Sequence, residues 1–236
     1  MKYPVSFDKM LADCAAAGVP FAVASGRTLP SLWRIFEKWA DRLIFFALDG
    51  ALCTAGKVRI ADHPIPPETV SLMLGSADDY TGIELCTRSK SCLLSNKPFL
   101  HESEQRRLGG EYARLEAPPD EPVYKIILFG RRGSEPGIPD GLHAVYKNET
   151  ITELVRADVD KALAASELCG ALGIPASKAA AFGDGENDRT LLRFAGIPVT
   201  IYGAKHDIFS LSHRHTENAA EYVRLLLREN DSAERK

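Results

Sequence analysis

Three short polar segments of this 236-residue sequence combine residue types that can bind a phosphate group and a metal ion. The segments are Ser25-Gly26-Arg27, Asp49-Gly50-Ala51 and Gly183-Asp184-Gly185-Glu186-Asn187-Asp188. A serine hydroxyl and the backbone N–H groups at the start of a helix can bind phosphoryl oxygens. Two carboxylates and an amide within one loop can bind a hard cation such as Mg²⁺ through oxygen. Together the segments predict a site for Mg²⁺ and phosphate.

Each of these segments also has an ordinary structural interpretation. Ser25 could serve only as the N-cap of the next helix, and the aspartates of 183–188 could only cap the helix that follows them. The acidic loop is not an EF-hand calcium loop, because Arg189 stands where that loop requires glycine. Lys161 could supply positive charge to a bound anion, although a single lysine is more often a solvated surface charge. The combination of all four features favours a functional site.

Short apolar runs directly before the polar segments predict buried strands of a parallel sheet. We expect strands at 19–24, 43–48, 178–182 and 198–202. The spacing of apolar residues predicts helices at 6–17, 162–172, 189–195 and 216–229. This alternation is typical of βαβ units in an open α/β sheet, where ligands bind at the carboxyl ends of the strands. The three polar segments lie at those ends.

The middle third of the sequence lacks this regular alternation. Prolines punctuate the chain at 64–67 and again at 118–122, a strand is expected at 123–129, and 131–142 is a loop rich in glycine and proline. We therefore interpret this third as an inserted domain of short strands and helices.

The composition excludes several classes of protein. Lysine and arginine total 29 against 32 acidic residues, and this near balance gives no reason to expect a nucleic-acid partner. A hydrophobic content of 45% excludes intrinsic disorder, and no apolar run approaches the roughly 18 residues that a membrane span needs. Ser6 and Asp8 stand where a signal peptide would be apolar. We expect a soluble, cytoplasmic protein.

The cysteines and histidines do not predict a metal centre. The five cysteines are odd in number and never spaced as Cys-x-x-Cys, which is typical of reduced thiols. His213 and His215 could share one face of a strand, but two histidines do not make a metal site.

The sequence resembles the haloacid dehalogenase-like (HAD) superfamily, in particular the Cof-type sugar-phosphate phosphatases. The second motif of that family is similar to Ala22–Arg27 (AVASGR), and the third-motif lysine to Lys161. The fourth, acidic motif is similar to 183–196 (GDGENDRTLLRFAG), followed by 202–205 (YGAK). The strand before the cap domain is similar to 47–53 (ALDGALC), with Asp49 where the family has asparagine.

The resemblance implies an α/β fold, with a Rossmann-like parallel-sheet core interrupted by an α+β cap. The core would comprise residues 1–62 and 153–236, and the cap residues 63–152. The implied activity is Mg²⁺-dependent hydrolysis of a phosphomonoester through an aspartyl-phosphate intermediate. The substrate would be a small phosphorylated metabolite, a sugar phosphate first, with nucleotide or cofactor phosphates and a phosphomutase reaction as alternatives. The oligomeric state is left open.

The resemblance also assigns roles to individual residues. Ser25 and Lys161 would be catalytic. Asp184 would be a Mg²⁺ ligand, and Asp188 a second ligand or a residue that supports the metal indirectly. The phosphate-binding residues would be Ser25, Gly26, Arg27, Lys161 and Asn187.

One family motif has no counterpart in this sequence. The motif Asp-x-Asp-Gly-Thr supplies the nucleophile and should precede the helix expected at 6–17. The segment 45–53 (FFALDGALC) looks similar, but Ala47 occupies the nucleophile position and the segment follows the second motif. We therefore reject it as the nucleophile loop.

Two hypotheses follow from this difference. Either the chain lacks about the first twenty residues of an ordinary phosphatase, or it is complete and is an inactive phosphate-binding, metal-binding or interaction protein. The first is favoured because the remaining site residues are present: Ser25, Lys161, Asp184 and Asp188. We expect the chain as written to be inactive or nearly so unless it is extended at its N-terminus.

Overall fold

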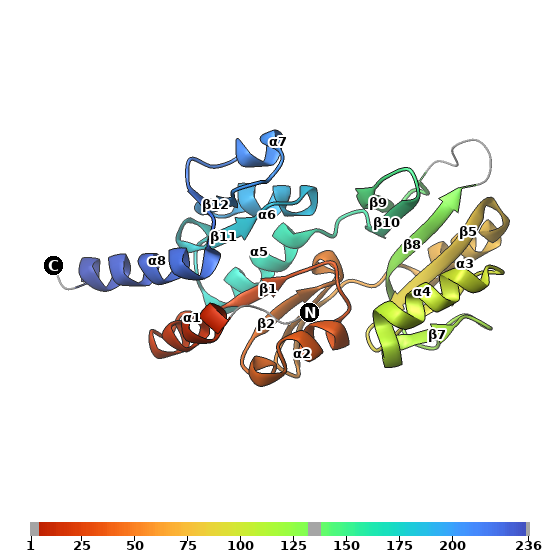
Figure 1. The fold of residues 1–236 in the computed structure, drawn as a ribbon, viewed down its shortest axis with the longest axis horizontal. Coiled ribbons are helices and arrows are strands. Elements are labelled where there is room, and N and C mark those ends of the chain that lie inside the picture. The colour runs from red at the N-terminus through yellow and green to blue at the C-terminus, as the bar shows by residue number, and fades with distance from the viewer. Residues whose placement is uncertain (1–4, 132–137, 235–236) are drawn as a thin grey trace.

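The computed structural model of the protein describes residues 5–131 and 138–234. Figure 1 shows two lobes: the N-terminal and C-terminal parts of the chain form the first lobe, and the middle of the chain forms the second. No helix in these two ranges is long and apolar enough to cross a lipid bilayer.

The first lobe contains two separate β-sheets. One has the order β1-β2-β3-β4, with β1 parallel to β2 and antiparallel pairing in the rest. The other has the order β11-β12-β13 and is parallel throughout. The strands are β1 (Ala22–Ala24), β2 (Ile44–Ala47), β3 (Leu52–Ala55), β4 (Val58–Asp62), β11 (Ala180–Gly183), β12 (Ile197–Ile201) and β13 (His215–Thr216).

Helices cover both faces of these strands. Phe45 of β2 belongs to an apolar cluster with α1 and α2, whereas its neighbour Phe46 belongs to a cluster with α5 and α6. Because successive side chains of a strand point to opposite faces, β2 is buried on both sides, as its unbroken apolar sequence predicts. The helices are α1 (Val5–Ala16), α2 (Leu29–Ile35), α5 (Lys161–Leu172), α6 (Arg189–Phe194), α7 (His206–Phe209) and α8 (Ala219–Glu234).

The second lobe is a six-stranded sheet in the order β7-β6-β5-β8-β10-β9 with two helices. Its pairing is antiparallel except between β6 and β7. We keep residues 63–152 as the proposed extent of this cap; β10 itself ends at Arg156. The elements are α3 (Pro67–Gly75), β5 (Tyr80–Thr87), β6 (Ser91–Leu94), α4 (Pro98–Leu108), β7 (Tyr112–Arg114), β8 (Val123–Arg131), β9 (Leu142–Lys147) and β10 (Ile151–Arg156).

The predicted alternation of strands and helices in the first lobe is confirmed, with differences at some ends. The last helix begins at Ala219, not at Thr216, because the Asn218 side chain accepts hydrogen bonds from the N–H groups of residues 220 and 221 and so caps it. His213 lies outside β13, so it does not share a strand face with His215. The predicted loop at 131–142 falls largely on 132–137, outside the described residues.

Among the described residues, β1 and β11 each have an open edge, as do β4 and β13 at the other ends of the same sheets. Within the described ranges, β1 pairs only with β2, and β11 pairs only with β12. Ala22 and Ala24 pack against the same apolar cluster that contains Ala181 of β11, so both edges lie on the layer formed by α5 and α6. All three residues of β1 are only half-buried although all are apolar. An unpaired edge leaves backbone N–H and C=O groups available to another strand.

Candidate active site

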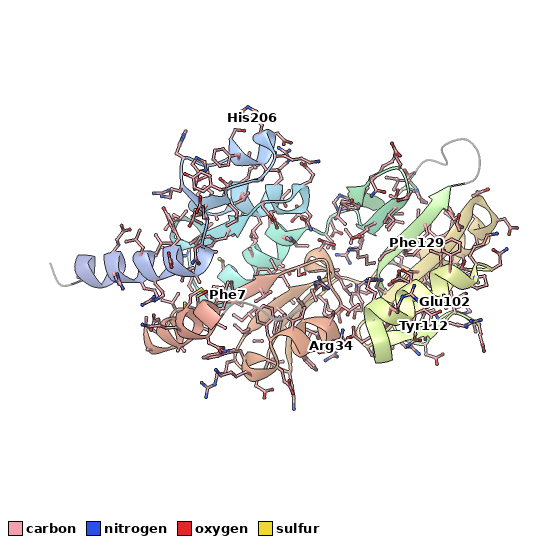
Figure 2. All side chains as sticks on the ribbon, in the orientation of Figure 1. Phe7, Arg34, Glu102, Tyr112, Phe129 and His206 are labelled. Atoms are coloured by element: carbon pink, nitrogen blue, oxygen red, sulfur yellow. The ribbon has the colours of Figure 1, made fainter. Side chains whose placement is uncertain are left out.

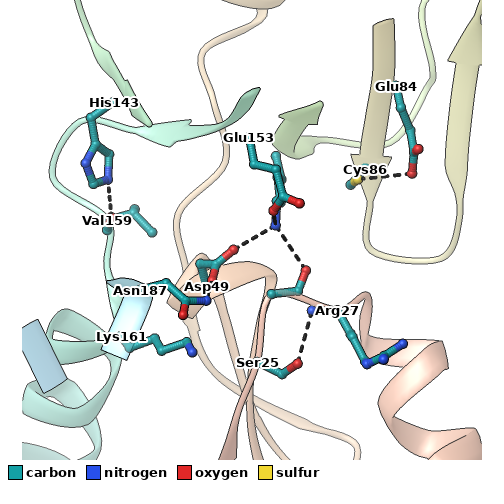
Figure 3. Close-up of polar contacts among 12 residues, drawn as sticks. Ser25, Arg27, Asp49, Glu84, Cys86, His143, Glu153, Val159, Lys161 and Asn187 are labelled. Carbon is teal, nitrogen blue, oxygen red and sulfur yellow. Dashed lines mark hydrogen bonds and ion pairs between the residues drawn. The ribbon is translucent and has the colours of Figure 1, made fainter. Parts of the chain in front are cut away.

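Ser25-Gly26-Arg27 lies at the carboxyl end of β1. The Ser25 Oγ accepts a hydrogen bond from the Arg27 N–H at 3.3 Å. The N-cap of α2 is Thr28, whose Oγ1 accepts from the N–H of Ser31, so the structure excludes N-capping as the role of Ser25. The Arg27 side chain is exposed, and Figure 3 shows it extending away from Lys161 and Asn187.

Asp49 lies in the turn after β2 and forms a buried ion pair with the second lobe. Its side chain is 1% exposed, and its Oδ2 accepts from the Nζ of Lys125 on β8 at 2.7 Å. The Lys125 Nζ also donates to the Gly26 carbonyl at 3.2 Å and pairs with Glu153 on β10. Figure 3 labels Asp49 and Glu153, the two carboxylates that pair with this ammonium. The ion pair thus links the ends of β1 and β2 to the second lobe.

Two glycines leave room for these contacts. A Cβ on Gly26 would lie 2.9 Å from the Asp49 Oδ2 and 3.1 Å from the Lys125 Nζ. Gly50 has a φ of +98°, and a Cβ there would lie 2.3 Å from the backbone oxygen of Asp160. Only glycine has both the conformational freedom and the small size that this approach to α5 requires.

The acidic loop at 183–188 is held by Asp188. Its Oδ1 accepts from the Lys161 Nζ at 2.6 Å, and its Oδ2 accepts from the N–H groups of Asp184 at 3.1 Å and Gly185 at 3.0 Å. Lys161 is 4% exposed, so it is not the solvated surface charge of the alternative interpretation. Asn187 donates from its Nδ2 to the Asp49 Oδ1 at 2.8 Å. The loop is therefore bonded both to α5 and to the turn after β2.

The oxygen atoms of this loop suit an open Mg²⁺ site better than a site in which protein side chains supply every ligand. The described residues contain no group of three or more His, Cys, Asp or Glu side chains arranged for a metal ion. Mg²⁺ characteristically takes one or two carboxylates and obtains its other ligands from water and phosphate. The exposed carboxylate of Asp184 matches that requirement. Both Asp188 oxygens already accept hydrogen bonds, one from Lys161 and the other from two backbone N–H groups of the loop.

The charges of Asp49 and Lys125 stabilise each other. Burial alone would raise the pKa of Asp49, but Lys125, with smaller contributions from Lys161 and Asn187, holds the pKa below its ordinary value. Burial would likewise lower the pKa of Lys125, but Asp49 and Glu153 hold it above its ordinary value. Both groups are therefore ionised at neutral pH.

Replacing Asp49 by Asn and Lys125 by Met together is expected to flatten the pH dependence of the free energy of unfolding. The pair stabilises the fold fully between the ordinary pKa values of the two groups, 3.8 and 10.5. Because the pKa of Asp49 is lowered, this stabilisation is lost as the pH falls from 3.8 through the lowered value. Because the pKa of Lys125 is raised, it is also lost as the pH rises from 10.5 through the raised value.

Urea unfolding at a series of pH values measures this effect. The control is Asp13→Asn with Arg224→Met, which removes an ion pair of 2.8 Å between two more exposed side chains. The control should keep the parent's pH dependence, because exposed pairs contribute little to stability. If the free energy of unfolding has the same pH dependence in the parent and in the Asp49/Lys125 double variant, the pKa shifts assigned to this pair are wrong.

A cavity of about 200 Å³ lies beside this network. The first lobe contributes Asp49, Lys161 and Asn187 to its wall, and β9 of the second lobe contributes His143. The His143 ring is held by a hydrogen bond of 2.7 Å from its Nε2 to the carbonyl of Val159. The cavity is smaller than the roughly 300–1,000 Å³ of most ligand pockets, and its wall combines groups of both signs.

The residues predicted from the sequence did not include Lys125, Glu153 or His143. One signal was present in the sequence: Lys125 interrupts an otherwise apolar strand at 123–129 (VYKIILF). A lysine in a buried strand needs a partner of opposite charge, because burying an unpaired charge is costly. The identity of that partner follows only from the tertiary structure.

Comparisons with known proteins agree with this architecture. A family model described as haloacid dehalogenase-like hydrolase matches residues 2–222. A protein of Streptococcus pyogenes serotype M6, named "Putative bifunctional phosphatase/peptidyl-prolyl cis-trans isomerase", is 26% identical over 217 residues. That match covers 87% of this chain and 44% of the relative, so the chain spans less than half the length of that protein.

Solved structures share the fold at low sequence identity. SMU.1108c from Streptococcus mutans UA159 has a TM-score of 0.82 at 16% identity, covering 94% of this chain and 91% of that one. A haloacid dehalogenase-like hydrolase from B. subtilis has a TM-score of 0.77 at 20% identity, with coverages of 94% and 93%. The HAD subclass IIB sugar phosphatase BT4131 has a TM-score of 0.76 at 17% identity, with coverages of 95% and 92%.

The family match spans nearly the whole chain, and the solved structures have the same Rossmann-like core. The chain therefore belongs to the haloacid dehalogenase-like hydrolases, in the Cof-type branch that its motifs indicated.

Proposed function

We propose that the protein is a Mg²⁺-dependent phosphatase that hydrolyses the phosphomonoester of a small metabolite. The observation that carries the proposal is a continuous set of contacts joining the three polar segments. It runs from the Gly26 carbonyl through Lys125 to Asp49, and from Asp49 to Asn187. The next residue, Asp188, pairs with Lys161. These contacts support the proposal that the phosphate-binding and the cation-binding segments belong to one site.

In this proposal each residue has a defined task. The Ser25 hydroxyl and the N–H of Gly26 bind phosphoryl oxygens at the end of β1. Lys161 neutralises negative charge on the phosphate, and Asp188 fixes the position of its ammonium. Asp184 is the carboxylate that would hold Mg²⁺, which would screen the phosphate charge during transfer. A sugar phosphate is the substrate we propose first, because one structural neighbour, BT4131, is a sugar phosphatase.

We propose further that the nucleophile is an aspartate on an additional strand, not among the described residues, that would pair with both β1 and β11. The open edges of β1 and β11, and their packing on one helical layer, support this placement. A carboxylate at the carboxyl end of such a strand would lie beside Ser25 and Asp184. Its oxygen would attack phosphorus while the bond to the leaving alcohol breaks, and water would then release the phosphate.

A version of the chain extended by an apolar strand that ends in Asp-x-Asp-Gly-Thr tests the proposal. It is expected to hydrolyse p-nitrophenyl phosphate with Mg²⁺ and to lose that activity in EDTA. The control carries Asn in place of the first aspartate of the added segment and is expected to be inactive. Activity that survives EDTA would contradict the mechanism. Binding of inorganic phosphate and Mg²⁺ without hydrolysis would instead support the phosphate-binding alternative.

A further inference from the structure

Lys125 forms a buried polar contact between the two lobes. Its side chain is 2% exposed, and it reaches from β8 of the second lobe to Asp49 of the first. In β8 the neighbours of this lysine are apolar: Tyr124 and Ile126 are both almost fully buried. A lysine at such a position is costly unless its ammonium is fully paired. The presence of a lysine here therefore calls for an explanation beyond the packing of the sheet.

The groups around the ammonium show what would happen if the lobes separated. Asp49 and Glu153 face it from different elements, and the Gly26 carbonyl accepts its third contact. If the lobes separated, Lys125 and Glu153 would move away together, and Asp49 would keep Asn187 as its hydrogen-bond partner and the charge of Lys161. Withdrawal of β8 would thus free the Asp49 carboxylate to rotate.

Asp49 transmits this contact to the acidic loop. Its two oxygens are used on opposite sides, since Oδ2 accepts from Lys125 and Oδ1 accepts from Asn187. With the Nδ2 of Asn187 bonded to Asp49, its Oδ1 remains for another partner, and Asn187 lies on the cavity wall. The orientation of this amide therefore depends on a carboxylate that the second lobe holds in place.

We propose that Lys125 is a positioning residue that couples closure of the second lobe to the orientation of Asn187, through Asp49. With the lobes closed, the ammonium fixes Asp49, and Asp49 fixes the Asn187 amide beside Lys161 and the cavity. With the lobes apart, Asp49 and Asn187 lose that constraint, so the site is assembled only when the cap covers it. The functional importance of the coupling rests on the proposed phosphatase function, but the coupling itself does not.

A second contact between the lobes provides a control. Glu111 of the second lobe accepts a hydrogen bond from the Thr28 Oγ1 of the first at 2.6 Å and forms an ion pair with Arg34 of α2, labelled in Figure 2. This contact does not reach Asp49 or the acidic loop. A Glu111→Gln change weakens the interface without altering the route from Lys125 to Asn187.

The experiment follows the side-chain amide of Asn187 by ¹⁵N NMR in the full chain, without substrate or metal. Its two proton signals are assigned by their loss in Asn187→Asp. In Lys125→Met we expect these signals to shift and their exchange with water to become about tenfold faster or more, because the hydrogen bond to Asp49 opens more often. In Glu111→Gln we expect the chemical shifts of these signals and their rate of exchange with water to match those of the parent.

The separation of the lobes is measured in parallel by the distance between two spin labels. The labels are attached at Lys178→Cys in the first lobe and Glu102→Cys in the second, two exposed positions, with Cys169→Ser to remove the one half-buried cysteine. Glu102 is labelled in Figure 2. Lys125→Met is expected to add longer distances to the distribution, whereas Lys90→Met, on an exposed turn of the cap, is not.

A double variant separates positioning from stability. Asp49→Asn with Lys125→Met removes both charges, so we expect it to be more stable than Lys125→Met alone yet to keep the longer label distances. If Lys125→Met folds and the Asn187 side-chain amide keeps the parent's chemical shifts and rate of exchange with water, the proposal is overturned. Should Lys125→Met not fold, closed label distances in the double variant would overturn it instead. Because neither readout needs turnover, failure of the coupling and failure of the phosphatase proposal remain distinguishable.

Discussion

Asp184→Asn in the strand-extended protein is expected to lower kcat/KM for a phosphomonoester about 1,000-fold. Asp184 is the exposed carboxylate of the acidic loop, and neutralising it removes the charge that would hold Mg²⁺ at the phosphate. Loss of one strong electrostatic contact to a developing charge costs about 10²–10³ in rate, and a metal ligand stands at the upper end of that range.

The measurement is steady-state hydrolysis of p-nitrophenyl phosphate across a titration of Mg²⁺. Asp41→Asn, a neutralised carboxylate at an exposed position of the same lobe, is the control and should retain the parent's kcat/KM. The stability of Asp184→Asn should stay within about 0.5 kcal/mol of the parent, as is usual for surface positions. A loss of less than tenfold at saturating Mg²⁺ would remove Asp184 from the proposed metal site.

Lys161→Met is expected to lower the free energy of unfolding by about 3–5 kcal/mol. The side chains of Lys161 and Asp188 are 5% and 11% exposed, and their ion pair spans 2.6 Å. Removing the ammonium leaves a buried carboxylate that keeps two backbone N–H donors but loses its counter-charge. An uncompensated buried charge is among the few causes of single-residue effects this large.

Urea unfolding at pH 7 measures this loss. Lys178→Met, on an exposed turn of the same lobe, removes the same charge and should change the free energy of unfolding by less than about 0.5 kcal/mol. Adding Asp188→Asn to Lys161→Met should recover part of the loss, because position 188 then no longer carries a buried charge without a counter-charge. A loss below about 1 kcal/mol in Lys161→Met would mean that the carboxylate is compensated in another way.

The elements that carry the site could be predicted from local sequence, and the structure has them. The apolar runs before Ser25, Asp49 and Asp184 form β1, β2 and β11, because runs buried on both faces are a local property of the chain. Lys161 begins α5, and the N-cap before it is Asp160, as local capping chemistry favours. These segments lie far apart in the sequence, and the parallel arrangement brings their ends together.

Some contacts of the site could not be predicted in this way. Asp49 stood out in the sequence as a polar residue after a buried strand, whereas its partner Lys125 lies 76 residues away on another lobe. The Asn187–Asp49 hydrogen bond joins residues separated by 138 positions. Neither spacing has a local signature, because the first contact depends on how the two lobes dock and the second on how the two sheets of the first lobe pack together.

The sequence by itself determined the α/β core, the polar segments at its strand ends and the family of hydrolases to which the chain belongs. Those properties follow from the periodicity of apolar residues, from helix-capping residues and from short motifs, all of which act over a few residues. Only the tertiary structure decided that Asp188 is bonded to Lys161 and to two backbone N–H groups. It also decided that Lys125 of the cap contacts the site through an ion pair with Asp49. The physical reason is that pairing of buried charges is selected by three-dimensional proximity in a medium of low polarity, and sequence distance does not report that proximity.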